Sequence, residues 1–320
     1  MTVPTNTVTA HVAIGNREDL SDVIYDISPL ETPFISNASQ GNATGVYHEW
    51  QTDALEAAGT NRQIEGDDAT ANTHVPTVRP GNYCQISRKV VSVSRTQRTV
   101  NSAGRGDELS YQISKRGKEL KRDMEYAVTR NQASTAGGAG TARSLASLES
   151  WIATNKTSVG TGTAQTTPGY SSGTVAAPTD STVLGAITEA SLKDVIQQVW
   201  TQGGDATMVM VGATTKQAIS GFSGIATQYR DNPQVGQAVI IGAADVYVSD
   251  FGSHMIVPNR FSRDETALVL DLDHLSVDFL DNMVRDPLAK TGDSEKELLT
   301  CEYTLRVGNE LACGKVTDIS

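Results

Sequence analysis

The clearest pattern in the chain is a helical repeat of apolar residues between positions 107 and 132. Apolar side chains recur there mostly every four residues, which places them on one face of a helix, and charged residues fill the other faces. Gly106 or Asp107 can cap the first turn, and a glycine-rich stretch at 137–140 follows the segment. We therefore predict one long helix over residues 107–132. Its apolar positions are Leu109, Ile113, Leu120, Met124 and Val128.

Residues 41–103 predict a long two-stranded excursion. Residues 46–51 and 86–100 alternate between apolar and polar positions, as strands do. The segment 54–72 between them is polar and predicts a mobile tip. Because this alternation is too polar to build a core of its own, we expect the excursion to rest on another surface.

The second half of the chain predicts a compact αβ unit followed by strands. A helix with apolar spacing follows Thr188 or Ser191, a buried strand spans 207–211, and a short helix spans 214–220. Before this unit, residues 145–155 predict a short amphipathic segment, and the Ser/Thr-rich residues 157–182 predict a surface loop or polar hairpin. The strands expected afterwards span residues 238–241, 246–248, 255–257, 267–270, 275–280, 297–307 and 311–319.

The N-terminal residues predict an extended arm that leads into a short helix. Residues 1–16 lack helical periodicity, whereas the apolar residues of 17–26 share one helical face. The pairs Ser28-Pro29 and Thr32-Pro33 end this helix, because a residue before proline is disfavoured in the α region. The arm, like the excursion, has too little apolar content to be stable alone. Segments that need a partner surface are typical of a self-assembling protein.

The composition is that of a packed protein made in a reducing compartment. With 320 residues, 38% hydrophobic and 20% charged, the chain can bury a core. It has no apolar run near the roughly 18 residues of a membrane span, and its start lacks the features of a secretory signal. Cys84, Cys301 and Cys313 form no CxxC pair. We expect synthesis in the cytoplasm, no membrane association, no disulfide framework and no cofactor.

The formal net charge of −11 is unevenly distributed along the chain. Residues 1–85 carry a net −8, residues 86–130 a net +6, residues 131–230 a net zero, and residues 231–320 a net −9. The acidic balance and the 5% aromatic content argue against specific recognition of nucleic acid. Any account of function should explain why one basic segment lies between two acidic ones.

Catalytic motifs are weak in this sequence. Asp271, Asp273 and His274 could supply two carboxylates and an imidazole to a hydrolytic or metal site. However, they end an apolar strand, where turn-forming Asp is ordinary, and hard cations need more oxygen ligands than this run supplies. A soluble hydrolase that uses these three residues is kept as an alternative.

Two segments carry a resemblance to a known family. Residues 17–34, REDLSDVIYDISPLETPF, are similar to the opening of the short-armed branch of the major capsid proteins of tailed bacteriophages. Residues 288–294, LAKTGDS, followed by EYTL at 302–305, are similar to the closing strands of that branch. The order of the expected elements agrees over nearly the whole chain. The resemblance implies an α+β, Hong Kong 97-type capsid fold with no catalytic residues to carry over.

The resemblance implies five parts of the chain. These are an N-terminal arm at 1–40, an extended E-loop at 41–103, a P-domain with a spine helix at 104–152, an axial A-domain at 153–262, and C-terminal strands at 263–320 that complete the P-domain. Some relatives carry a scaffolding segment ahead of the arm, and we expect none ahead of the arm of this protein. We therefore expect either a separate scaffold or self-sufficient assembly.

The resemblance also implies a function and a set of partners. The chain would be a major capsid protein that self-assembles, as pentamers and hexamers, into an icosahedral phage head around packaged double-stranded DNA. Its location would be the virion capsid. Expected partners are other copies of the chain, a portal protein, a separate scaffold or decoration protein and, without specific recognition, the DNA. A phage tail or receptor-binding protein is an alternative, suggested by the Thr/Gly-rich strands.

The order of charge along the chain predicts where copies touch. Head-to-tail contacts in a closed shell join two different patches, so a basic segment of one subunit can face an acidic segment of the next. We expect an inter-subunit surface formed by Tyr47, Trp50, Arg88, Arg95 and Arg98.

Overall fold

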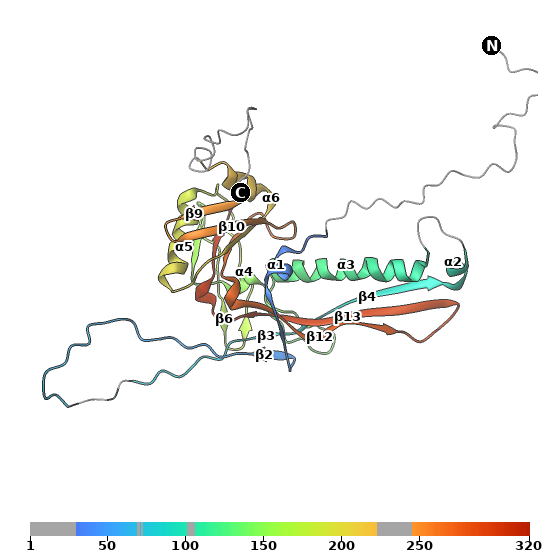
Figure 1. The fold of residues 1–320 in the computed structure, drawn as a ribbon, viewed down its shortest axis with the longest axis horizontal. Helices are drawn as coiled ribbons and strands as arrows, with labels where there is room; N and C mark the ends of the chain where they lie inside the picture. Colours follow the sequence, from blue (N-terminus) through green and yellow to red (C-terminus); the bar gives the residue numbers. More distant parts are fainter. Residues whose placement is uncertain (1–29, 69–70, 72, 101–105, 223–244) are drawn as a thin grey trace, which may run out of the picture.

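The computed structural model describes residues 30–68, 71, 73–100, 106–222 and 245–320. The fold is an elongated α+β structure with two main sheets (Figure 1). A four-stranded sheet and one long helix form a narrow body, and a six-stranded sheet with its own helices lies towards one end of it. The helix predicted over 17–26 and the strand predicted over 238–241 lie outside the described residues.

The four-stranded sheet has the order β1-β12-β13-β4. Strands β12, β13 and β4 are antiparallel neighbours, and β1 joins the edge parallel to β12. Strand β12 is longer than predicted because it keeps pairing with β13, through two register shifts, as far as Pro287, and β13 is longer because it pairs with β4 from Ser294 onward. The four strands span Ser39–Asn42 (β1), Leu275–Pro287 (β12), Ser294–Val307 (β13) and Gln85–Ser94 (β4).

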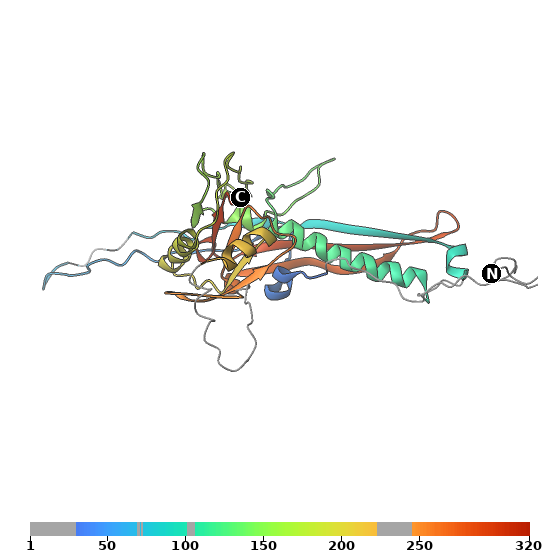
Figure 2. The ribbon, with the colours of Figure 1, turned by 90° about the horizontal axis from the view of Figure 1, so that it is seen from above.

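The predicted long helix is confirmed as α3 (Glu108–Thr129), which covers one face of this sheet (Figure 2). The side chain of Asp107 caps the helix by accepting a hydrogen bond from the backbone N–H of Ser110 at 3.3 Å. Near its start, Leu109 packs against Val91 and Val93 of β4. The apolar face that the sequence pattern predicted is therefore the face that contacts the sheet.

The strand predicted over 86–100 is shorter than expected. Strand β4 ends at Ser94, and the next five residues form the short helix α2 (Arg95–Thr99). The Ser94 hydroxyl oxygen accepts a hydrogen bond from the backbone N–H of Gln97 at 3.3 Å, which starts the helix. The predicted strand was wrong for residues 95–100. Residues 95–99 have no apolar side chain that could pack against α3 as Val91 and Val93 do.

The six-stranded sheet has the order β5-β14-β11-β8-β10-β9. Helices α5 (Glu189–Thr201) and α6 (Ala213–Ser220) share one core cluster with it. The helix predicted after Thr188 starts with a reciprocal capping box between Thr188 and Ser191. The strands span Lys156–Ser158 (β5), Gly314–Thr317 (β14), Ala267–Leu270 (β11), Met208–Val211 (β8), Gly252–Pro258 (β10) and Val246–Ser249 (β9).

Short elements connect these layers. The polar hairpin expected within 157–182 contains β6 and β7. The short elements span Pro33–Asn37 (α1), Leu148–Trp151 (α4), Tyr170–Ser171 (β6), Thr174–Val175 (β7), Leu272–His274 (η1) and Glu310–Ala312 (η2).

The C-terminal segment contributes to both sheets. Strands β12 and β13 belong to the four-stranded sheet, whereas β11 and β14 lie inside the six-stranded one. Every residue of β11 and β14 is buried, so these strands need cover on both faces. Residues 263–320 therefore supply strands to both sheets. The strand predicted over 311–319 is shortened because η2 precedes it.

The excursion forms regular strands only at its base. Strand β2 (Tyr47–Glu49) pairs with β3 (Gly81–Tyr83), and a single bridge joins Thr52 to Val78. Every described residue from 53 to 79 is exposed. The loop projects from one end of the body, and α2 lies at the other end (Figure 1). The prediction that the excursion has no core of its own is confirmed.

A buried carboxylate fastens α1 to α3. Glu125 has no exposed surface, and its two carboxylate oxygens accept the backbone N–H groups of Phe34 at 2.8 Å and Ile35 at 3.0 Å. The amide of Asn259, after β10, donates a third hydrogen bond at 2.7 Å. Burial raises the pKa of Glu125, and the three donors oppose that rise. One side chain thus joins α1, α3 and the chain that leaves the six-stranded sheet.

The six-stranded sheet holds a second buried charge. Lys315 of β14 has no exposed surface, and its Nζ donates a hydrogen bond to the backbone oxygen of Glu149 at 2.6 Å. The Glu149 carboxylate accepts hydrogen bonds from Gln165 at 2.9 Å and Thr266 at 3.0 Å, and lies 3.3 Å from the guanidinium of Arg263. Burial lowers the pKa of Lys315 from 10.5 to about 8, although the Glu149 charge opposes this.

Replacing Glu125 with Gln should loosen α1. The amide offers one acceptor oxygen where the carboxylate offers two, so the N–H of Phe34 or Ile35 loses its partner. A buried unpaired N–H costs about 1–3 kcal/mol, so hydrogen exchange at these amides should accelerate at least about fivefold. Glu119→Gln on the same helix is the matched control. Unchanged exchange in Glu125→Gln would contradict the anchoring role.

The stability contributed by Lys315 should rise with pH between about 8 and 10.5. In this range the folded lysine is neutral while the unfolded one still binds a proton, so raising the pH favours the folded state. Urea unfolding of the subunit, followed by tryptophan fluorescence, should be compared with that of Lys315→Met. The wild-type advantage should grow by about 3 kcal/mol across this range. A difference that stays constant with pH would contradict the buried, neutral lysine.

Candidate inter-subunit contact site

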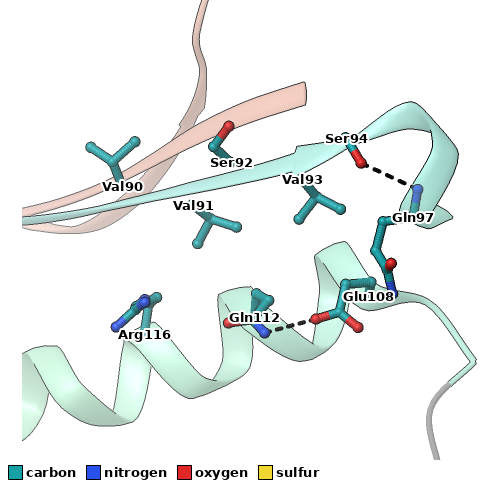
Figure 3. A pocket seen from close by; sticks show the side chains of 9 residues that line it. All are labelled: Val90, Val91, Ser92, Val93, Ser94, Gln97, Glu108, Gln112 and Arg116. Carbon is teal, nitrogen blue, oxygen red and sulfur yellow. Dashed lines mark hydrogen bonds between the residues drawn. The ribbon is translucent and has the colours of Figure 1, made fainter. Parts of the chain in front are cut away.

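The predicted contact arginines lie in two settings, one within strand β4 and one in helix α2. Val91 and Val93 of β4 point towards α3, whereas Val90 and Ser92 point away from it (Figure 3). Arg88 has the same parity as Val90, so it belongs to the sheet face that α3 leaves uncovered, and it is exposed. Arg95 and Arg98 are exposed residues of α2.

The three arginines differ in what holds them. Arg98 forms an ion pair with Glu295 of β13, and its Nε lies 3.4 Å from Asp107. Lys290 at 2.9 Å, together with Arg98, holds the pKa of Glu295 below its usual range. Within the described part of the chain, neither Arg88 nor Arg95 forms an ion pair. Arg98 therefore holds α2 against its own subunit, and the guanidinium groups of Arg88 and Arg95 are available to another molecule.

A polar groove of about 330 Å³ lies between β4, α2 and α3 (Figure 3). Inside it the amide of Gln112 donates a hydrogen bond to the carboxylate of Glu108 at 2.7 Å. Its lining contains neither histidine nor cysteine. The residues that line it are Val90, Val91, Ser92, Val93, Ser94, Gln97, Glu108, Gln112 and Arg116.

Tyr47 and Trp50 lie at the base of the loop, in an aromatic cluster of their own subunit. The ring of Tyr47 lies 4.6 Å from that of Tyr83, and the ring of Trp50 lies 5.4 Å from that of Trp151. The hydroxyl groups of Tyr47 and Tyr170 are 3.5 Å apart. Both residues are half-buried, and burial raises the pKa of Tyr47. The structure thus gives them a role in holding the loop base, which the sequence did not predict.

A buried carboxylate also ties the loop base to the long sheet. His48 Nε2 lies 2.9 Å from Oδ2 of Asp278 on β12, and Ser276 Oγ donates a hydrogen bond to Oδ1 at 2.7 Å. Arg306 approaches the same carboxylate at 3.5 Å. A Cβ at Gly41 would lie 2.2 Å from Oδ1, so only glycine leaves room for this carboxylate beside β1. No spacing in the sequence links His48 to Asp278, so the contact could not be predicted.

The three residues of the hydrolase alternative, Asp271, Asp273 and His274, lie at the start of the short helix η1, which Asp271 caps. Asp271 is buried, and its oxygens accept hydrogen bonds from the backbone N–H groups of Asp273 at 3.1 Å and Asp205 at 3.2 Å. His274 Nε2 is 3.8 Å from Oδ2 of Asp271. Among the described residues, no group of three or more His, Cys, Asp and Glu side chains could hold a metal ion. This arrangement starts η1 and does not favour the hydrolase alternative.

None of the helices in the described ranges is both long enough and apolar enough to span a membrane.

Comparison with known proteins places the whole chain in one family. The family of SU10 major capsid proteins matches residues 3–320. The major capsid protein of Escherichia phage Phieco32 is 29% identical to this chain over 340 residues, which cover 94% of this chain and 93% of that protein. The tail-protein alternative is therefore not favoured.

Solved structures support the same fold. The capsid of an empty GTA particle is similar with a TM-score of 0.65 and 10% identity, covering 99% of this chain and 100% of that one. A chain of Mycobacterium phage Adephagia is similar with a TM-score of 0.59 and 13% identity, covering 99% of both chains. The α+β, Hong Kong 97-type capsid fold expected from the sequence is confirmed, and with nearly every residue matched this chain belongs to the SU10 major capsid protein family, whose members form phage capsids.

Proposed function

We propose that the chain assembles, as pentamers and hexamers, into an icosahedral phage head that encloses packaged double-stranded DNA. The main support is the charge at the two ends of the elongated subunit. The loop projects from one end of the subunit (Figure 1) with a net charge of −4 over residues 53–68, and α2 at the other end carries Arg95, which has no ionic partner among the described residues. Opposite charges at opposite ends suit head-to-tail contacts, which close into rings.

In this proposal the loop of one subunit reaches the α2 end of its neighbour. Exposed ion pairs contribute only about 0–1 kcal/mol each, so they set register and partner choice more than strength. Leu55 and Ile64 are 99% and 80% exposed in the loop. Burying an apolar side chain of this size contributes about 1.5–3 kcal/mol, so these two residues would supply more of the binding energy than the charges.

Arg95 at the receiving end and Arg88 on the uncovered face of β4 are the proposed charge contacts, because neither has an ionic partner among the described residues. Arg98 belongs to the same surface, but Asp107 and Glu295 of the same subunit already pair with it. Tyr47 and Trp50 would act at the base of the loop, where the neighbour's body begins. Each contact is weak, but every subunit has several neighbours, so later contacts form at high effective concentration.

Other partners follow from the same proposal. A shell that is filled with DNA needs a portal protein, and its assembly would use a separate scaffold or decoration protein. The chain would be made in the cytoplasm of the bacterial host and act in the virion capsid as a structural protein without a catalytic step. The five-part division into arm, E-loop, P-domain, A-domain and C-terminal strands stays a prediction.

Reversing the charge of Arg88 and Arg95 to Glu should weaken assembly. The variant should need a several-fold higher protein concentration than the wild type to form megadalton particles. Size-exclusion chromatography and negative-stain microscopy measure this concentration. Adding Asp67→Lys and Asp68→Lys to the same chain should restore part of the assembly, because the pair then has opposite signs again.

Lys193→Glu is the matched control, because this exposed helix residue lies outside the proposed contact. Particles of Arg88→Glu, Arg95→Glu that form as readily as wild type would contradict the contact. A wild-type chain that stays a single 34.0 kDa monomer under all conditions would contradict the function itself.

A further inference from the structure

A row of basic side chains lies on the side of α3 that faces away from the sheet. Successive helix residues are turned by about 100°, so Lys115, Lys118 and Arg122 lie opposite the buried residues Leu109 and Leu120. Lys121 flanks them, and the three lysines are exposed. The four-stranded sheet runs along one side of α3 (Figure 1). These four residues are called the basic row below.

The basic row has no neutralising partner within the described residues. None of its four members forms an ion pair there. The three acidic residues nearest the row are engaged elsewhere. Glu119 pairs with Arg116 at 2.6 Å, Asp123 pairs with Lys89 at 2.6 Å, and Glu125 binds the start of α1.

This arrangement has a local energetic cost. Lys118 lies three or four residues from each other member of the row, and like charges at these spacings destabilise a helix by about 0.2–0.5 kcal/mol per pair. A solvated helix face ordinarily mixes both signs, and the chain as a whole carries a net charge of −11. A concentrated cationic row in an acidic protein indicates that an anion from outside the subunit binds there.

The surroundings of the row favour a phosphate backbone over a protein. Protein interfaces need an apolar centre, but among the exposed large apolar side chains of the described residues only Tyr126 belongs to α3. Nucleic-acid backbones need only cations, which release condensed counterions on binding. From Lys115 to Arg122 the helix rises about 10 Å, which spans about three phosphates along one strand of a duplex.

We infer that the basic row of α3 binds the phosphate backbone of the packaged DNA, so that the α3 side of the subunit forms the inner wall of the shell. This inference rests on the proposed function, because it needs a shell that contains DNA. The binding is independent of base sequence, since all four members of the row are cations, which contact phosphates. The inference explains how a protein with a net negative charge can enclose DNA. Most of its surface repels DNA, and the basic row of each subunit contacts it.

Lysine acylation of intact heads tests this directly. Empty and DNA-filled heads would be treated with a small amine-acylating reagent that passes through the shell, and each lysine quantified by mass spectrometry. Lys115, Lys118 and Lys121 should react at least threefold less in filled heads than in empty heads, while Lys193 and Lys290 should react equally in both. High reactivity of the row in both kinds of head would overturn the inference, because DNA would then leave the row uncovered. Low reactivity in both would also overturn it, because a protein would then cover the row.

A matched pair of single variants gives a second test. Lys118→Glu and Lys193→Glu each reverse one exposed helix lysine, and both should assemble into heads. Lys118→Glu should yield a several-fold smaller fraction of DNA-filled heads, because a negative charge is repeated at the inner wall in every subunit. Equal filling of the two variants would overturn the inference. Failure of Lys118→Glu alone to form heads would show that the row binds another protein, and failure of the wild-type chain to form heads would overturn the proposed function as well.

Discussion

The loop between residues 53 and 79 buries none of its described side chains in its own subunit, and this single constraint organises the rest of the molecule. Leu55 of this loop is 99% exposed, and large exposed apolar side chains ordinarily mark a surface that contacts another molecule. The fold therefore becomes complete only when another surface covers the loop. Because the loop and α2 lie at opposite ends of the body, a second copy can supply that surface and leave its own loop free for a third.

Such an arrangement works only if the body between the two ends is rigid. Three buried charges at element junctions serve this purpose: Glu125 joins α1 to α3, Asp278 joins the loop base to β12, and Lys315 lies inside the six-stranded sheet. Buried charges are weak sources of stability because desolvation offsets their attraction. Their value here is geometric, since each contacts a group on another element that only one arrangement of the elements brings within reach.

The sequence predicts those parts of the fold that local periodicity determines. The i+4 repeat that ends near Val128 predicts α3, and the polar alternation of residues 41–103 predicts an excursion without a core. Helix α2 was missed because its signal is one capping residue, Ser94, inside an alternating pattern. The division of the C-terminal strands between two sheets, and the contact of His48 with Asp278, depend on pairings between distant segments. Periodicity carries no information about such pairings.

The central claim is that the loop of one subunit lies on the α2 end of the next. It can be tested by oxidising assembled particles in which Asp67→Cys and Arg95→Cys are present in the same chain. The three native cysteines are buried, so background coupling should be low. The account predicts disulfide-linked ladders of whole subunits up to the size of a pentamer or hexamer on a denaturing gel, absent from either single variant. Particles that assemble normally but yield only monomers after oxidation would contradict it.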